Sequence, residues 1–140
     1  MSRPAINETY MEIAHIMAKR STCPRRSVGA LLVKENRIIS SGYNGAASKQ
    51  QQCNEVGCLM EHGHCIRAIH AEHNVILFAA RYGIETNNTT LYCTTIPCAY
   101  CAKAIIQAGI TKVIYEDGDY SNSGADILKA SNIELLHFGE

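Results

Sequence analysis

The chain contains 140 residues, of which 46% are hydrophobic and 19% are charged. Its 13 basic and 13 acidic residues give a formal net charge of zero at pH 7. This length suits one domain, so we expect residues 1–140 to form a single unit with its own core. The balanced charge offers no polycationic surface to a phosphate backbone, which argues against a long nucleic acid as the partner.

The N-terminal segment mixes apolar residues with Arg3, Glu8 and Glu12. No apolar stretch approaches the roughly 18 residues that a membrane-spanning helix needs, so we expect neither a signal peptide nor a contact with a membrane. We therefore expect a cytoplasmic protein. In that reducing compartment, seven cysteines indicate metal ligation more than disulfides.

The first part of the chain predicts a helix, a hairpin and a long connection. Apolar residues recur every three or four positions in residues 4–20, which is typical of a helix that covers a sheet. Residues 28–33 and 37–40 are two predicted strands with a short polar link, which favours an antiparallel hairpin. Residues 42–69 show little periodicity, and a connection of this length indicates a function or a metal brace.

The second part alternates between helices and strands. A helix is predicted from His70 to Tyr82, with Gly83 as its C-terminal stop. Further elements are predicted at residues 91–94 (strand), 97–108 (helix), 112–115 (strand), 121–130 (helix) and 133–138 (strand). Strands separated by helices need crossover connections, which place helices over the sheet faces. We therefore expect an α/β fold with three α/β/α layers and a five-stranded mixed sheet.

Three residues between positions 70 and 101 have the types and spacing of a catalytic zinc site. His70 and the two cysteines of a Pro-Cys-x-x-Cys motif, Cys98 and Cys101, supply three protein ligands. Catalytic zinc usually takes three, which leaves the fourth position to water. The predicted topology brings two helix N-termini to one edge of the sheet, where these residues would meet and where the helix dipole favours thiolates.

Glu72 is the expected proton carrier of this site. It lies two residues after His70, and paired H-x-E and P-C-x-x-C motifs are the signature of zinc-dependent nucleobase deaminases. The alternative is a closed structural zinc site in which Glu72 is only a solvated helix residue. A closed site needs a fourth protein ligand, and we expect His73 to point roughly 100° or more away from His70.

Segments along nearly the whole chain resemble deoxycytidylate (dCMP) deaminases. The matching segments are 21–23, 28–30, 42–45, 63–65, 69–72 with Asn74, and 97–110. The resemblance implies a cytidine deaminase-like fold and hydrolysis of dCMP to dUMP and ammonia, which supplies thymidylate synthesis. It also implies a homohexamer that dCTP activates and dTTP inhibits, with Mg²⁺ accompanying the effector nucleotide.

The same resemblance implies roles for residues outside the zinc site. Substrate contacts are expected from Ala71, Asn74 and Tyr120, and effector contacts from Gly42, Tyr43, Asn44 and Gly45. The alternatives are an ordinary Asn-Gly turn at residues 44–45, a loop cap at Asn74 and a surface tyrosine at Tyr120. On charge alone, Arg25 and Arg26 are candidates for binding the substrate phosphate.

Four more cysteines lie in or just before the connection at residues 42–69. Cys23, Cys53, Cys58 and Cys65 suit a second, closed zinc site that would brace this connection, and His64 is the alternative to Cys65. Some phage and bacterial members of the resembled family carry such a structural zinc. The other reading is free thiols, or one disulfide under oxidising conditions.

Other functions share the same catalytic residues. A deaminase of another cytosine nucleoside or nucleotide, or of adenosine in tRNA, would also need His70, Glu72, Cys98 and Cys101. A function of a different class is a non-enzymatic zinc scaffold that senses nucleotides through the region around Asn44.

Overall fold

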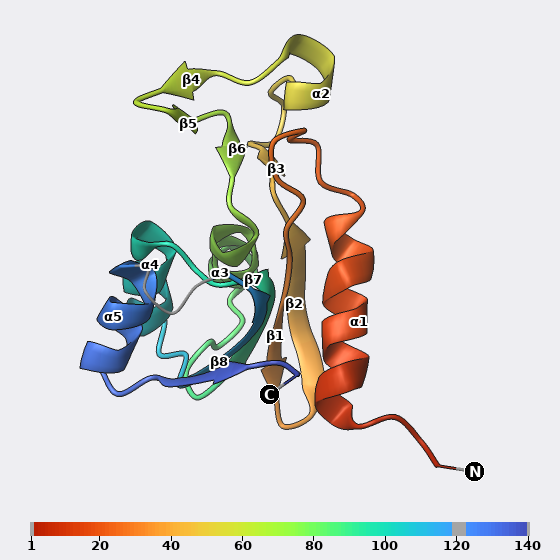
Figure 1. Cartoon of the computed structure of the whole chain (residues 1–140), viewed down its shortest axis with the longest axis vertical. Coiled ribbons are helices and arrows are strands. Elements are labelled where there is room, and N and C mark those ends of the chain that lie inside the picture. Colours follow the sequence, from red (N-terminus) through yellow and green to blue (C-terminus); the bar gives the residue numbers. More distant parts are fainter. Residues whose placement is uncertain (1, 119–122, 140) are drawn as a thin grey trace.

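The central sheet of the computed structural model has five strands, in the order β2-β1-β7-β8-β9 (Figure 1). The structure describes residues 2–118 and 123–139. The layered elements are α1 (Ile6–Ala18), β1 (Gly29–Lys34), β2 (Arg37–Tyr43), α3 (Ala71–Tyr82), β7 (Thr90–Thr95), α4 (Ala99–Gln107), β8 (Lys112–Asp117), α5 (Ser123–Ala130) and β9 (Glu134–His137).

Strand direction divides the sheet into two halves. β1 pairs antiparallel with both β2 and β7, whereas β7, β8 and β9 run parallel to one another. The parallel pairs require crossovers, which α4 and α5 provide. The predicted mixed, five-stranded α/β sheet is therefore confirmed. β2 continues to Tyr43, beyond its predicted end at residue 40, because it pairs along the whole of β1.

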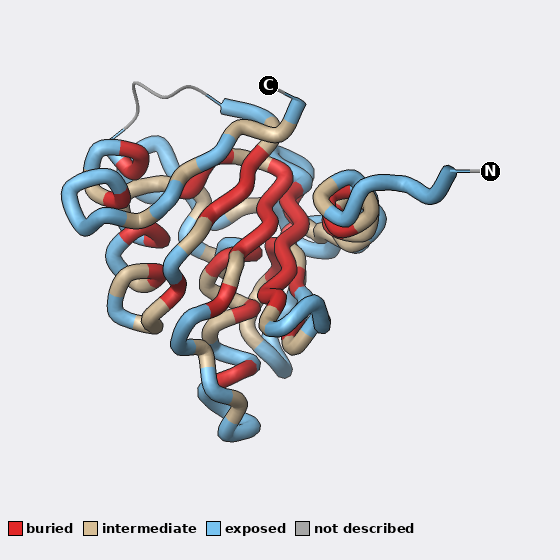
Figure 2. The backbone as a smooth tube through the Cα atoms, turned by 90° about the horizontal axis from the view of Figure 1, so that it is seen from below, coloured by how far each residue is buried: buried red, intermediate tan, exposed pale blue. Residues whose placement is uncertain are grey.

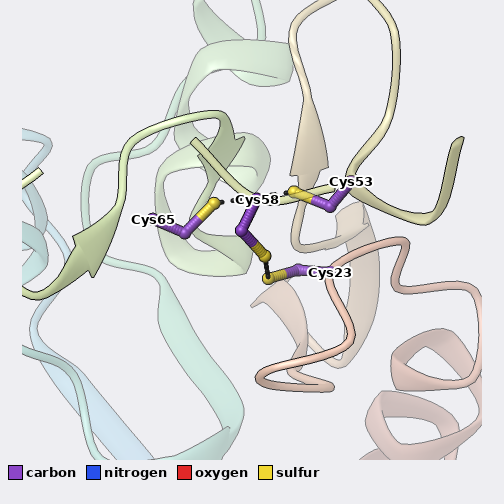
Figure 3. A group of neighbouring side chains, drawn as sticks. All are labelled: Cys23, Cys53, Cys58 and Cys65. Carbon is purple, nitrogen blue, oxygen red and sulfur yellow. Dashed lines mark hydrogen bonds between the residues drawn. The ribbon is translucent and has the colours of Figure 1, made fainter. Parts of the chain in front are cut away.

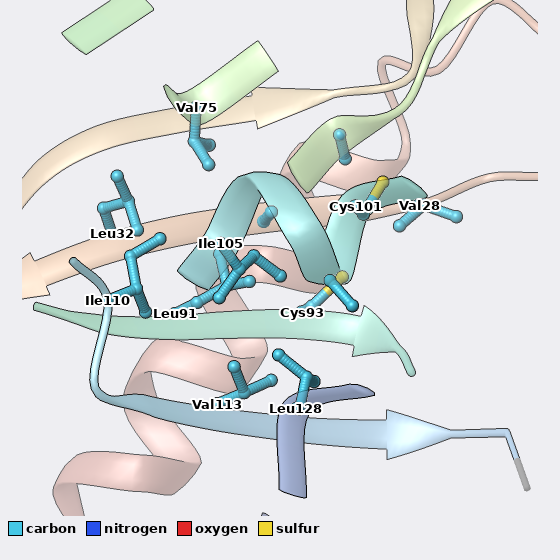
Figure 4. Packing of buried hydrophobic residues seen from close by; sticks show 13 residues of the cluster. Val28, Leu32, Val75, Leu91, Cys93, Cys101, Ile105, Ile110, Val113 and Leu128 are labelled. Carbon is cyan, nitrogen blue, oxygen red and sulfur yellow. The ribbon is translucent and has the colours of Figure 1, made fainter. Parts of the chain in front are cut away.

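The two faces of the sheet bury different sets of side chains. In β1, Ala30 and Leu32 pack in the cluster that includes residues of α3, α4 and α5, whereas Leu31 and Val33 pack against α1. Figure 4 shows the first cluster, and Figure 2 shows the buried strands between the covering helices. Because both faces are covered, β1 is apolar without alternation, as a strand in a three-layer fold must be.

Residues 45–69 form a segment that we call the arm, which extends beyond the layers (Figure 1). Its short elements are β3 (Gly45–Ala46), α2 (Cys53–Val56), β4 (Met60–Glu61), β5 (His64–Cys65) and β6 (Ala68–Ile69). Its larger apolar side chains Val56, Leu59, Met60 and Ile66 are exposed. The arm therefore lacks the apolar burial that stabilises the layers, and other cross-links must hold it.

Within the part of the chain that the structure describes, no helix combines the length and apolar character that crossing a bilayer requires.

Candidate active site

His70, Cys98 and Cys101 meet where α3 and α4 begin. His70 is the N-cap residue of α3 and Cys98 that of α4, while Cys101 lies in the first turn of α4. The Nδ1 atom of His70 is 3.5 Å from the Cys98 sulfur and 3.3 Å from the Cys101 sulfur. All three donor atoms lie within 4.8 Å of one another. The predicted meeting of two helix N-termini thus brings these residues together.

The donor set fits one tetrahedral zinc ion. Sulfur and nitrogen ligands at about 2.3 and 2.0 Å from zinc lie roughly 3.5 Å apart at tetrahedral angles, which is close to the separations of 3.5 and 3.3 Å from His70. A hydrogen bond from the Cys101 thiol, and then one from His70, lowers the pKa of Cys98 to about 3 despite its burial. The hydrogen bond with Cys98 raises the pKa of His70. The site therefore already favours one thiolate without a metal.

Glu72 is buried beside these donors, with 3% of its surface exposed. Burial raises its pKa, and the charge of Cys98 adds to the rise, whereas His70 and Arg26 oppose it. Cys93, at the centre of β7, is also fully buried, and its pKa is raised by burial and then by Glu72. A carboxyl group in such surroundings holds a proton more readily than one in water, as a proton carrier must.

His73 corrects the sequence interpretation. Its Nδ1 atom lies 3.4 Å from the Cys101 sulfur, so its side chain points toward the site. The expected separation from His70 was wrong, because three helical steps of 100° return a side chain to within about 60° of its starting direction. The spacing His-x-x-His on one helix was the signal that could have revealed this contact. His73 is not in the group of three mutually close donors.

A cavity of about 390 Å³ lies at the carboxyl ends of β7 and β8. Its lining comprises His15, Arg25, Arg26, Ser27, Val28, Thr94, Thr95 and Asp117. The Arg26 guanidinium donates a hydrogen bond to the Thr95 hydroxyl at 3.2 Å, whereas that of Arg25 donates to the Met60 sulfur at 3.5 Å. Arg26 is also close enough for its charge to act on both His70 and Glu72. Position thus distinguishes Arg26 from Arg25, which the sequence could not do.

Cys23, Cys53, Cys58 and Cys65 form a second cluster, which joins the loop after α1 to the arm (Figure 3). The Cys23 and Cys58 sulfurs are 3.8 Å apart, and those of Cys53 and Cys65 are 3.5 Å apart. Tetrahedral zinc with sulfur ligands at about 2.3 Å has sulfur separations of about 3.8 Å, so four thiolates fit one ion. All four cysteines are free, and His64 is outside the group.

The thiols of the second cluster differ in their affinity for protons. Burial, and then a hydrogen bond with Cys65, raises the pKa of Cys53 to about 12. Burial also opposes ionisation of Cys65, but hydrogen bonds with the backbone of Ala68 and Arg67 lower its pKa to about 6. Without metal, one thiolate therefore forms readily while its neighbour stays protonated.

The segment at residues 42–45 is extended rather than a tight turn, because β2 reaches Tyr43 and β3 begins at Gly45. Gly42 packs against α3, where an added Cβ would lie 3.2 Å from the Cβ of Asn74. Tyr43 is half-buried under the Arg20 guanidinium, which is 5.9 Å from the ring centre. Asn44 is buried, and both polar atoms of its side chain bond to the backbone of the loop before β1.

The three residues expected to contact substrate differ in their positions. Ala71 is buried as the first residue of α3, between His70 and Glu72. The amide nitrogen of Asn74 donates to the Tyr43 carbonyl at 2.7 Å, so this side chain ties α3 to β2. Tyr120 lies outside the described residues.

Gly124 allows α5 to approach the loop that carries Cys98. A Cβ atom added at Gly124 would lie 2.0 Å from the Pro97 carbonyl oxygen and 2.8 Å from the carbonyl carbon of Cys98. Both are backbone atoms, which cannot move aside as a flexible side chain can. No sequence pattern indicates this contact, since it depends on how α5 packs on α4.

Comparisons with known proteins agree with this arrangement. Residues 4–117 match the family described as the cytidine and deoxycytidylate deaminase zinc-binding region. The ComE operon protein 2 of Bacillus subtilis is 47% identical over 120 residues, which cover 86% of this chain and 63% of that protein. The deoxycytidylate deaminase of Schizosaccharomyces pombe is 38% identical, over 97% of this chain and 45% of that protein. The chain thus spans less than two thirds of the length of these two relatives.

The fold has a counterpart among solved structures. The dCMP deaminase of cyanophage S-TIM5, in complex with dCMP and dUMP, superimposes with a TM-score of 0.86 at 32% identity. The match covers 99% of this chain and the whole of that one. The family match, these relatives and the shared fold lead to one conclusion: the chain belongs to the cytidine and deoxycytidylate deaminase family.

Proposed function

We propose that this protein hydrolyses dCMP to dUMP and ammonia. The observation that carries the proposal is the juxtaposition of three zinc-type donors, the buried Glu72 and a cavity that Arg26 lines. The S. pombe relative is named a deoxycytidylate deaminase, and the S-TIM5 structure contains dCMP and dUMP, which supports the choice of substrate.

His70, Cys98 and Cys101 would hold the catalytic Zn²⁺. Bound zinc supplies a Lewis acid that lowers the pKa of water to about 7, so that a nucleophile is available at neutral pH. The chain's own residues prepare this site, since the hydrogen bond from Cys101, and then that from His70, favours the thiolate of Cys98 and lowers its pKa. His73 contacts the Cys101 sulfur and would orient this ligand without itself binding the zinc ion.

Glu72 would move the protons of the reaction. Its carboxylate accepts a proton from the attacking water and delivers it to N3 of the cytosine ring, while the oxygen adds to C4. A second proton passes from the new hydroxyl group at C4 through Glu72 to the amino group at C4, which leaves as ammonia as the C4–N bond breaks and the C4=O bond of dUMP forms. Burial, which raises the pKa of Glu72, makes it able to hold each proton between these transfers.

Arg26 would bind the substrate phosphate. One monophosphate needs a local group of donors and no basic surface, which is compatible with the net charge of zero. Arg26, Thr94 and Thr95 offer such donors in the cavity, and the Arg26 charge also acts on His70 and Glu72. Ala71, Asn74 and Tyr120 remain proposed contacts to the base and sugar.

Cys23, Cys53, Cys58 and Cys65 would hold a second, structural Zn²⁺. Four thiolates complete a tetrahedral shell, so this ion would cross-link the chain and carry no reactive water. The exposed apolar side chains of the arm support this role, because the arm needs a cross-link in place of a core.

The proposed regulation by dCTP and dTTP rests on the resemblance to dCMP deaminases. The enzyme would act in the cytoplasm as a homohexamer, with dCTP as activator, dTTP with Mg²⁺ as inhibitor, and its dUMP used for thymidylate synthesis. Of the proposed effector residues Gly42, Tyr43, Asn44 and Gly45, Tyr43 offers a partly accessible ring beside the Arg20 guanidinium. A ring and a cation are suited to a base and a phosphate.

Ammonia release from purified protein tests the proposal. The substrates are dCMP, deoxycytidine and an adenosine-containing tRNA stem-loop, each with and without dCTP or dTTP. We expect dCMP to be the best substrate. Activity on only the other two would reject dCMP deamination, and tight dCTP or dTTP binding without any deamination would indicate a nucleotide-sensing scaffold instead.

A further inference from the structure

The Asn44 side chain holds the loop that carries Arg26. Its Nδ2 atom donates to the Arg26 carbonyl at 2.7 Å, and its Oδ1 atom accepts from the Val28 amide at 2.9 Å. The Asn44 backbone adds an N–H bond to the Val28 carbonyl at 3.3 Å. One buried asparagine thus fixes the chain on both sides of Ser27, with 5% of its surface exposed.

Further contacts hold the backbone of the same loop. The Ser21 hydroxyl also donates to the Arg26 carbonyl, at 2.9 Å, and the loop begins at Cys23 in the second cluster. From this fixed backbone the exposed Arg26 side chain reaches Thr95 at 3.2 Å, on the wall of the cavity. A long side chain binds an anion more tightly when its backbone is held, because less conformational entropy remains to be lost.

We propose that Asn44 is a positioning residue for the substrate phosphate, which acts through Arg26 and so gives the enzyme its preference for a nucleotide over a nucleoside. This inference rests on the proposed deamination of dCMP. It assigns Asn44 a function that needs no contact between its amide and any ligand, since the contacts that carry it lie within the chain.

The substrates dCMP and deoxycytidine differ only in the phosphate, so comparing them distinguishes positioning of Arg26 from a contact with the sugar or base. A residue that contacts the sugar or base affects dCMP and deoxycytidine alike, whereas a residue that acts through Arg26 affects dCMP alone. The variants are Asn44→Ala, Arg26→Ala and the double variant. Ser40→Ala is the matched control, because the buried Ser40 hydroxyl also bonds to a backbone carbonyl, that of Val75, but does not line the Arg26 cavity.

We expect Asn44→Ala and Arg26→Ala each to raise KM for dCMP roughly tenfold or more, with kcat less affected. Without dCTP or dTTP, Asn44→Ala should change the turnover of deoxycytidine less than about twofold, because it leaves the Arg26 charge in place beside His70 and Glu72. The double variant should resemble Arg26→Ala in its KM for dCMP, because both changes remove one function. Ser40→Ala should leave the ratio between the substrates unchanged.

Binding gives a second measurement that does not depend on turnover. Calorimetry in the Glu72→Gln background should show weaker dCMP binding and unchanged deoxycytidine binding after Asn44→Ala. Equal losses for both ligands, or additive losses in the double variant, would overturn the positioning role while leaving dCMP deamination intact. A wild-type protein that releases no ammonia from dCMP would instead reject the proposed function, and this inference with it.

Discussion

The two sulfur clusters of this chain differ in donor number and in what surrounds them. The first joins one histidine and two cysteines where two helices begin against the sheet, with Glu72 buried beside them. The second joins four cysteines from a loop and the arm, where large apolar side chains are exposed. Three donors leave one position of a tetrahedral ion to a reactant, whereas four donors fill it.

We propose that this difference gives the first cluster a catalytic role and the second a structural one. An open site needs rigid surroundings and a buried acid, which the layers of the fold provide. A closed site can lie in a segment with little core, since the ligands themselves hold that segment together.

Removing one donor from the first cluster should abolish activity and spare the fold. Cys101→Ala leaves His70 and Cys98, which are too few to hold the catalytic ion, so dCMP turnover should fall below detection. Metal analysis should show one zinc per chain, held by the second cluster. A variant that keeps two zinc ions would show that Cys101 is not a ligand.

Removing one donor from the second cluster should have the opposite effect. Cys58→Ser should reduce the zinc content to one per chain and lower the Tm by about 5 °C or more, because the arm loses its cross-link. Activity should persist at low temperature. Calorimetry and metal analysis of Cys58→Ser and Cys101→Ala side by side provide the comparison, and complete inactivation of Cys58→Ser would contradict the division.

Crowding α5 against the first cluster should weaken that site selectively. Gly124→Ala places a methyl group 2.0 Å from the Pro97 carbonyl oxygen, which should destabilise the protein by about 1–3 kcal/mol and shift Cys98. Titration with a zinc chelator should then remove the catalytic ion before the structural one. Ser123→Ala, an exposed change in the same helix, is the control. Unchanged zinc affinity would show that α5 does not position Cys98.

The smallest expected effect is a change in the pH dependence of stability. Because the pKa of Glu72 is raised in the folded state, its protonated form contributes stability that is present below the ordinary value of 4.5. That contribution is lost as the pH rises through the raised pKa. In metal-free protein, the free energy of unfolding should therefore decrease less between pH 5 and pH 8 for Glu72→Gln than for wild type. Urea denaturation measures this, with the exposed Glu8→Gln as control.

Sequence patterns predicted the layers because periodicity and crossover rules act on local segments. They placed His70 with Cys98 and Cys101, since residues that begin helices after neighbouring strands meet at one edge of a sheet. The sequence also favoured Cys65 over His64 as the fourth member of the second cluster, and the structure places the Cys65 sulfur within 4.8 Å of the other three.

The contacts that escaped prediction depend on packing between distant segments. Gly124 meets Pro97 only because α5 lies against α4, and Asn44 holds Arg26 across 18 positions of sequence. No local pattern encodes either contact. His73 is different, because its spacing from His70 already indicated a shared helical face.

The most direct test of the account compares wild type with Glu72→Gln in a dCMP deamination assay, with zinc counted in both. We expect two zinc ions per chain in each protein and a kcat that falls roughly 100- to 10,000-fold in the variant, because only the proton carrier is lost. Near wild-type turnover by Glu72→Gln with both ions in place would contradict it.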